Sequence, residues 1–132
     1  MNYKFIKLEK LANEIKTINN NILFITSKFH SKKKYISKLV EKLKKTKTVS
    51  LYGNVSSGAP ISDLNYIINK YQKPDLIIGI GGGSVMDIAK ACSCLFDQTD
   101  KKKIANIKIK KKIKTILIPT ILGSGAENSI GA

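Results

Sequence analysis

The sequence predicts one α/β domain over residues 1–132, built around a parallel, doubly wound sheet. Short runs of apolar residues recur along the chain and are typical of strands that are buried on both faces of a parallel sheet. Segments with apolar residues at helical spacing separate these runs, and Gly, Pro or Asn stands at most of the boundaries. Strands that alternate with helices at short spacing favour parallel pairing, because each helix forms the crossover between two strands.

The first half of the chain contains two helix and strand alternations. Behind a short apolar start at residues 3–6, apolar residues at intervals of three and four predict an amphipathic helix over residues 8–19. Residues 22–26 then form a continuous apolar run that predicts a buried strand. A second helix is expected over residues 35–43 with lysines on its outer face, followed by a strand at residues 48–52.

The second half continues the alternation around a run of glycines. Residues 53–60 read as a turn-rich loop, and residues 61–71 as a helix that ends before Pro74. Residues 75–80 are the clearest buried strand, and a helix over residues 84–96 follows three glycines. Small residues on that helix permit a close approach to the sheet; they are Ala89, Ala91 and Cys92. A last strand is expected at 115–118, closed by Pro119.

The charge is strongly positive and consists only of lysine. Twenty-four lysines stand against 9 acidic residues and give a net charge of +15, with no arginine in the sequence. Because lysine is a solvated point charge without the planar fork of arginine, this pattern favours an ordinary solvated surface over specific recognition of bases or phosphates. The alternative is attraction to an anionic partner. Residues 98–114 are expected to form a basic loop or a small edge hairpin.

Other features bound the compartment and the metal chemistry. Cys92 and Cys94 stand two apart in an apolar stretch and read as reduced core thiols. No signal core and no apolar run of membrane-spanning length is present, so we expect a cytoplasmic protein without a membrane partner. His30 is the only histidine, and its loop-like context predicts a surface residue rather than a ligand or a base.

The strongest local signal is the glycine loop between the strand at 75–80 and the following helix. Glycines let the backbone approach an anion, and the first turn of a helix leaves N–H donors and a positive dipole end that point the same way. Ser84 fits as the N-cap of the helix, with Asp87 completing a capping box, although Asp87 is an equal candidate for a cofactor contact. The spacing matches the GxGxxG fingerprint only weakly, and no Gly-Lys-Ser/Thr closes the loop as in a Walker motif.

Two blocks of sequence resemble the iron-containing (group III) alcohol dehydrogenases. Residues 75–90 read DLIIGIGGGSVMDIAK and are similar to the family's GGGSxxDxAK signature, and residues 118–127 read IPTILGSGAE and are similar to its PTTAGTGSE segment. The resemblance implies a Rossmann-like, dehydroquinate synthase-like nucleotide-binding domain for NAD or NADP. The positions that it assigns to the cofactor are Ser27, Gly81, Gly82, Gly83, Ser84, Asp87, Thr120, Ile121 and Ser124.

Some family positions are altered in this chain. Ile121 stands where the family has a second threonine, Ser124 where it has a later threonine, and Ala126 where it has a serine. Ala59 replaces an asparagine that often precedes the proline of the third loop. Hydroxyl contacts to the cofactor are therefore expected to be fewer than in the family at large.

The resemblance also implies a part that this sequence does not contain. Family members continue for more than twice this length into a helical domain, whose aspartate and three histidines bind Fe²⁺ or Zn²⁺. We therefore expect no catalytic or metal-binding residue here, and we expect the NAD(P)-binding half of a metal-dependent alcohol dehydrogenase or aldehyde reductase, inactive alone. Its partners would be a nicotinamide dinucleotide, a separate C-terminal metal domain or a second copy of the chain. Exposed apolar surface is expected around residues 116–130, where that domain would pack.

Two other readings stay open at the level of sequence. One is a basic, lysine-rich module that binds anions or nucleic acid without catalysis; the absence of arginine and the scarcity of aromatic residues disfavour a nucleic-acid partner. The other is a decayed fragment without a present function.

The resemblance finally implies a cofactor preference at one position. Ser27 stands where many NAD-dependent members have an aspartate, and Lys28 and residues 32–34 lie nearby, so NADPH is expected to bind at least as tightly as NADH. The alternative is that Ser27 is only a polar loop residue.

Overall fold

The chain forms a five-stranded sheet in which all neighbouring strands are parallel. The computed structural model describes residues 3–7, 10–15, 19–96 and 113–120. The strands are β1 (Tyr3–Phe5), β2 (Asn21–Ser27), β3 (Thr48–Val55), β4 (Leu76–Gly81) and β5 (Lys114–Pro119), in the spatial order β1-β5-β4-β2-β3. The predicted parallel α/β fold class is therefore confirmed.

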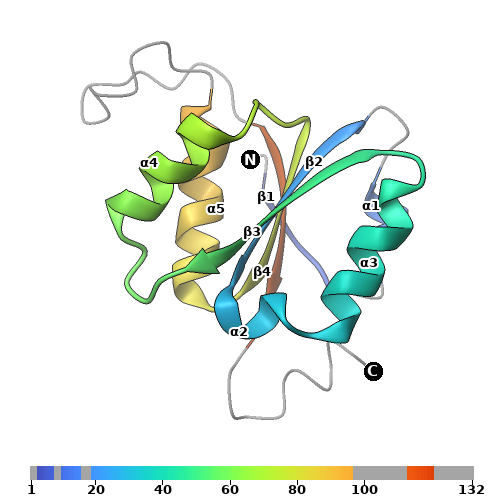
Figure 1. Cartoon of the computed structure of the whole chain (residues 1–132), viewed down its shortest axis with the longest axis horizontal. Coiled ribbons are helices and arrows are strands. Elements are labelled where there is room, and N and C mark those ends of the chain that lie inside the picture. Colours follow the sequence, from blue (N-terminus) through green and yellow to red (C-terminus); the bar gives the residue numbers. More distant parts are fainter. Residues whose placement is uncertain (1–2, 8–9, 16–18, 97–112, 121–132) are drawn as a thin grey trace.

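Helices cover both faces of this sheet (Figure 1). They are α1 (Leu11–Glu14), α2 (Lys28–Ser31), α3 (Lys34–Lys44), α4 (Ile61–Lys70) and α5 (Gly83–Leu95). Helices α4 and α5 lie on one face, α1 and α3 lie on the other, and the single turn α2 follows the end of β2 directly. Within the described part of the chain, none of the helices has the length and apolar character that a membrane crossing requires.

The core consists of two layers, because successive strand residues point to opposite faces. Leu23 and Ile25 of β2 join the layer beneath α4 and α5, whereas Ile22 and Phe24 join the layer beneath α1 and α3. All four side chains are almost fully buried. Burial of such a side chain stabilises the fold by roughly 1.5–3 kcal/mol, which explains why both faces of the central strands are apolar.

The strand order creates a switch point between β2 and β4. The chain leaves β2 toward β3 on one side, then returns across β2 to form β4 and β5 on the other side. In open α/β sheets, the crevice at the carboxyl ends of the strands beside such a reversal is the usual place for a ligand.

Helix α5 packs closely on β4, as the small residues of the sequence predict. A Cβ atom at Gly79 would lie only 2.9 Å from the Cβ of Ala89 and 3.3 Å from Cδ2 of Leu117. Ala89 and Cys92 are themselves fully buried. The backbone of β4 therefore approaches α5 more closely than any larger residue would permit.

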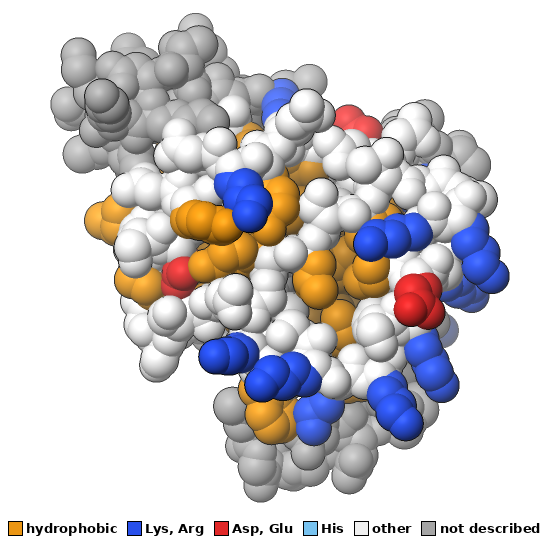
Figure 2. All heavy atoms as spheres, in the orientation of Figure 1, with side chains coloured by type: hydrophobic (Ala, Val, Ile, Leu, Met, Phe, Trp, Pro, Cys, Tyr) orange, Lys and Arg blue, Asp and Glu red, His pale blue; other side chains and the backbone are white. Residues whose placement is uncertain are grey.

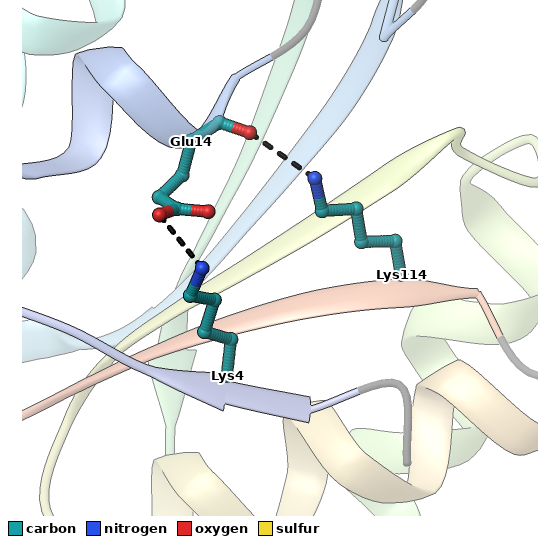
Figure 3. Close-up of polar contacts among 3 residues, drawn as sticks. All are labelled: Lys4, Glu14 and Lys114. Carbon is teal, nitrogen blue, oxygen red and sulfur yellow. Dashed lines mark hydrogen bonds and ion pairs between the residues drawn. The ribbon is translucent and has the colours of Figure 1, made fainter.

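The helix predicted over residues 8–19 is much shorter in the structure. Residues 8–9 and 16–18 lie outside the described residues, and α1 ends at Glu14, with Ile15 in an extended conformation. This segment joins β1, at one edge of the sheet, to β2, and it crosses β5 and β4 on the way. At the usual spacing between strands, the distance from β1 to β2 is about 14 Å. A single helical turn is fixed on the way: the Glu14 carboxylate pairs with Lys4 at 2.8 Å, and the Glu14 carbonyl oxygen accepts from Lys114 Nζ at 3.1 Å (Figure 3).

Two other expectations need correction near the carboxyl edge. Strand β3 continues to Val55, beyond the predicted end at residue 52, because its last residues pair with β2. Residues 116–118 were expected to be exposed, but they are buried because β5 lies between β4 and β1. Residues 121–130 of that predicted surface and residues 98–112 of the predicted basic segment lie outside the described residues. Lys114, at the end of the basic segment, is the first residue of β5.

Candidate functional site

A pocket of about 410 Å³ opens at the carboxyl ends of β2, β3, β4 and β5. It therefore lies at the switch point between β2 and β4. Segments from four places in the chain supply its walls, which are Ser27, His30, Val55, Ser56, Ser57, Gly82, Gly83, Ser84, Val85 and Thr120. The lower edge of the view in Figure 1 contains this end of the sheet, next to α2.

The glycine loop forms one wall of the pocket. Gly82 is the N-cap of α5, its carbonyl oxygen accepts the Met86 N–H at 3.0 Å, and the helix begins at Gly83. A helix of 13 residues leaves its first N–H groups without acceptors inside the helix, and they point out of its N-terminus. A Cβ at Gly83 would meet no atom within 4 Å, and one at Gly82 only the Thr120 carbonyl oxygen at 4.0 Å. The space in front of this turn is therefore open to a ligand.

The predicted capping box at this turn is wrong. No side chain caps α5, and Ser84 lies one residue inside the helix rather than before it. The Ser84 hydroxyl instead accepts the backbone N–H of Gly58 at 2.8 Å, so it fastens the loop after β3 to the glycine loop. Asp87 is exposed on α5 and is not among the residues that line the pocket.

Gly81 fixes the start of the loop. Its φ of 156° is one that residues with side chains rarely adopt, and a Cβ there would lie 2.7 Å from Cγ2 of Val85. The Gly81 carbonyl oxygen accepts the N–H of Thr120 at 2.8 Å. The ends of β4 and β5 are therefore joined directly below the pocket.

The loop after β3 is held by a buried carboxylate. Asp63 of α4 accepts the Tyr52 hydroxyl at 2.5 Å and the Ser56 N–H at 2.8 Å. Burial, and then the hydrogen bond to Asp63, raise the pKa of Tyr52 above its ordinary value. The phenol therefore stays protonated at neutral pH and keeps this bond, which fixes the wall of the pocket that Ser56 and Ser57 form.

His30 is buried and faces the pocket, contrary to the surface position that the sequence indicates. Only 1% of the residue is exposed. Its Nδ1 lies 2.9 Å from Ser27 Oγ and its Nε2 lies 3.0 Å from Thr120 Oγ1. Ser27 also caps α2 by accepting the His30 backbone N–H at 3.3 Å. The cap shapes the turn after β2 so that the His30 ring points back over the end of the sheet. In the surface loop that the sequence indicates, the ring would lie in solvent.

A basic cluster lies on the same turn, outside the pocket. Lys28, Phe29, Lys32 and Lys33 line a separate hollow, and Lys33 Nζ lies 4.3 Å from the centre of the Phe29 ring. Phe29 is 44% exposed. Elsewhere on the face drawn in Figure 2, lysines stand at separate places around hydrophobic side chains.

The structure brings five of the predicted cofactor positions together at the pocket: Ser27, Gly82, Gly83, Ser84 and Thr120. Gly81 lies directly beneath them, and Ile121 and Ser124 lie outside the described residues. Sequence reasoning missed His30, Ser56 and Ser57. A signal was available, because each lies shortly after, or at the end of, a strand whose carboxyl end faces the same edge.

Cysteine and metal chemistry are limited in the described residues. Neither Cys92 nor Cys94 forms a disulfide and both are buried, as predicted, and burial raises the pKa of the Cys92 thiol far above its usual range. Across residues 3–7, 10–15, 19–96 and 113–120, no three His, Cys, Asp or Glu side chains gather into a group that could hold a metal ion.

A glycine turn at a helix N-terminus, at the switch point of a parallel sheet, is typical of α/β domains that bind the phosphates of nucleotides. The sequence profile of the iron-containing alcohol dehydrogenases matches residues 3–132, and this chain belongs to that family. The family and its named dehydrogenase relatives are oxidoreductases.

Individual relatives agree with this assignment. An alcohol dehydrogenase of Thermococcus barophilus is 42% identical over 67 residues, which cover 43% of this chain and 18% of the relative. A sulfoacetaldehyde reductase of Bilophila wadsworthia is 28% identical over 127 residues, covering 91% of this chain and 33% of the relative. The chain thus spans a third or less of the length of these proteins.

Solved structures show the same fold. An iron-containing alcohol dehydrogenase from Thermotoga maritima superimposes with a TM-score of 0.69 at 24% identity, over 96% of this chain and 38% of that one. The NADH-dependent butanol dehydrogenase A from the same organism gives a TM-score of 0.73 at 22% identity, over 93% and 33% respectively.

Proposed function

We propose that this chain binds a nicotinamide dinucleotide, NAD(H) or NADP(H), as the cofactor-binding half of a metal-dependent alcohol dehydrogenase or aldehyde reductase. The observation that carries the proposal is the open glycine turn, Gly82 and Gly83, at the N-terminus of α5 and inside the switch-point pocket. The names of relatives support the substrate class: one is an NADH-dependent butanol dehydrogenase and another a sulfoacetaldehyde reductase.

The pocket suits a dinucleotide in its donors and its space. Backbone N–H groups at the first turn of α5 would bind the pyrophosphate, because the absence of Cβ atoms at Gly82 and Gly83 leaves room for an anion. The hydroxyl groups of Ser27 and Thr120 line the same pocket and would contact the ribose or amide portions. When bound, the nicotinamide supplies hydride transfer to or from a small alcohol or aldehyde.

The role of this chain's own residues is binding and orientation. We propose no catalytic side chain among them, and the described residues do not assemble a site for Fe²⁺ or Zn²⁺. As the family resemblance implies, we propose that residues 1–132 alone bind the cofactor without turnover. Activity would need a separate metal-binding domain, and a second copy of the chain is the other partner we propose. We also propose a cytoplasmic location, which the reduced state of Cys92 and Cys94 supports.

Replacing Gly82 with valine tests the proposal. The backbone of Gly82 is extended, with φ −87° and ψ −163°, and a Cβ there meets nothing closer than 4.0 Å, so the variant should fold. Its branched side chain would occupy the place of the pyrophosphate. We expect titration of NADH and NADPH fluorescence to show binding by the wild type, weaker binding by Gly82→Ala and none by Gly82→Val. Circular dichroism and the melting temperature control for folding, and unchanged affinity in a folded Gly82→Val variant would refute the site.

A further inference from the structure

The single histidine of this chain joins two walls of the pocket. Its ring lies between the end of β2 and the end of β5, with one nitrogen on the Ser27 hydroxyl and the other on the Thr120 hydroxyl. The two hydroxyls belong to residues that are 93 positions apart in the sequence, and both residues line the pocket together with His30. Thr120 is also bound through its backbone to Gly81, below the glycine turn.

The ring determines what the two hydroxyls offer to a ligand. A neutral imidazole carries one N–H donor and one acceptor nitrogen. At the acceptor nitrogen the neighbouring hydroxyl must donate its proton to the ring, so only its oxygen remains for a ligand. At the donor nitrogen the hydroxyl oxygen accepts from the ring, so its proton stays available. In its neutral form the ring makes Ser27 and Thr120 unequal, because one hydroxyl then presents a proton to the pocket and the other a lone pair, and the tautomer sets which is which.

The burial of the ring makes this arrangement rigid. With 1% of the residue exposed, water does not compete for either ring nitrogen, and the cap from Ser27 to the His30 backbone holds the residue in one place. Rotation of either hydroxyl away from the ring would break a buried hydrogen bond, and an intramolecular hydrogen bond contributes about 0.5–1.5 kcal/mol.

We propose that His30 is a positioning residue for the dinucleotide: its imidazole holds the Ser27 and Thr120 hydroxyls in one fixed donor and acceptor pattern across the pocket. The inference rests on the proposed function and deepens it, because it assigns the orientation of the cofactor's polar groups to a side chain that the family signature does not contain. Histidine suits the task because its two ring nitrogens reach in opposite directions and carry complementary roles.

Three substitutions separate the two contacts. His30→Asn retains a polar group near the position of Nδ1 and so retains the contact to Ser27, whereas His30→Gln retains one near Nε2 and so retains the contact to Thr120. His30→Phe fills a similar volume and retains neither. We expect His30→Phe to weaken NADH and NADPH binding about tenfold or more, the effect of losing a fixed hydrogen bond or two, with the other two variants intermediate. Ser31→Ala is the matched control, since it removes a hydroxyl from the same turn that bonds only to the Lys28 carbonyl oxygen among the contacts described.

A spectroscopic readout distinguishes positioning from general support of the fold. Because the chain has one histidine, nitrogen NMR of labelled protein reports the two ring nitrogens of His30 without ambiguity. We expect separate donor and acceptor nitrogen signals in the free chain, and we expect saturating NADH to shift them.

The outcomes are distinct. Unchanged affinity in His30→Phe, or ring signals that do not move on saturation, would overturn the role of His30 while the dinucleotide site stands. Equal losses in all three variants that follow their melting temperatures would also overturn it, because they would indicate a structural role only. A wild type that binds neither dinucleotide would refute the proposed function, and the role of His30 with it.

Discussion

At the scale of single residues, the structure gives Ser27 two tasks. Its hydroxyl caps α2 through the His30 backbone N–H, and it lies in the wall of the pocket where the resemblance places the cofactor ribose. Aspartate is as good an N-cap as serine, so the cap of α2 would survive a Ser27→Asp substitution. Lys28 follows Ser27 directly, and Lys32 lies on the same turn, so positive charge stands near this hydroxyl.

Cofactor preference is expected to depend on this position. We expect NADPH to bind the wild type at least as tightly as NADH, and Ser27→Asp to shift the preference toward NADH by ~1–2 kcal/mol, the scale of one charge-assisted contact. The carboxylate would accept the ribose hydroxyls and repel a 2′-phosphate. Competitive fluorescence titration measures the ratio of the two dissociation constants. Ser37→Asp adds the same charge on α3 and should leave the ratio unchanged; a tenfold preference for NADH in the wild type that Ser27→Asp does not alter would contradict the assignment.

Ala59 is a strained residue beside the site. Its φ of 49° lies in the left-handed region, which asparagine and glycine adopt more readily than alanine. We expect Ala59→Asn to raise the free energy of unfolding by ~0.5–1 kcal/mol, measured by urea denaturation, because asparagine relieves part of the left-handed cost. Ala59→Val is the opposite control, since a β-branched residue is least suited to this region, and equal stability of both variants would contradict the explanation.

At the scale of elements, the contact of α5 with β4 decides the position of the glycine turn. The helix begins where the strand ends, so any displacement of α5 from the sheet would move the N–H groups that face the pocket. That contact depends on the absence of a side chain at Gly79, opposite Ala89. The wall of the pocket at Ser56 depends on a second helix, α4, because Asp63 of that helix accepts both the Tyr52 hydroxyl and the Ser56 N–H.

Gly79→Ala is therefore expected to destabilise the chain. The added Cβ would lie 2.9 Å from the Cβ of Ala89, which cannot rotate away because it is attached to the helix backbone. Overpacking of this kind costs about 1–3 kcal/mol, visible as a lower urea midpoint. Gly83→Ala, at the first residue of α5, is the matched control, because a Cβ there meets nothing within 4 Å. A Gly79→Ala variant as stable as Gly83→Ala would show that α5 moves without cost.

At the scale of the whole molecule, the net charge of +15 could attract anions to the surface in general, in addition to any binding at the glycine turn. The lysines in Figure 2 are spread over much of the face that it draws, whereas the cluster of Lys28, Lys32 and Lys33 around Phe29 is local to one turn. Binding through backbone N–H groups at a helix end involves few released counterions, whereas binding of nucleic acid by scattered lysines releases many.

Salt therefore distinguishes the dinucleotide site from a general basic surface. We expect the affinity for NADPH to fall by less than about tenfold between ~50 and ~200 mM salt, and any affinity for a DNA duplex to fall by ~10³-fold or more. Fluorescence titration and anisotropy at both salt concentrations measure the two. Tight duplex binding that persists at the higher concentration, without NADPH binding, would favour the anion-binding module instead.

The fold class and the glycine turn at the centre of the candidate site could be predicted from the sequence alone. Strands buried on both faces must be apolar throughout, so β2, β4 and β5 are visible as continuous runs at residues 22–26, 75–80 and 115–118. The glycine turn is equally visible, because close approach of an anion to the backbone requires several residues without side chains. These are local requirements, and local sequence records them.

The strand order, the short α1 and the burial of His30 could be known only from the tertiary structure. Each depends on partners that are distant in the sequence: β1 pairs with β5, Glu14 is held by Lys4 and Lys114, and His30 meets Thr120 across 90 positions. A single histidine after a strand has the same sequence neighbours whether its ring faces solvent or, as here, the Thr120 hydroxyl. The difference arises because parallel strands bring their carboxyl ends to one edge of the sheet, and no local property of residues 27–30 contains that information.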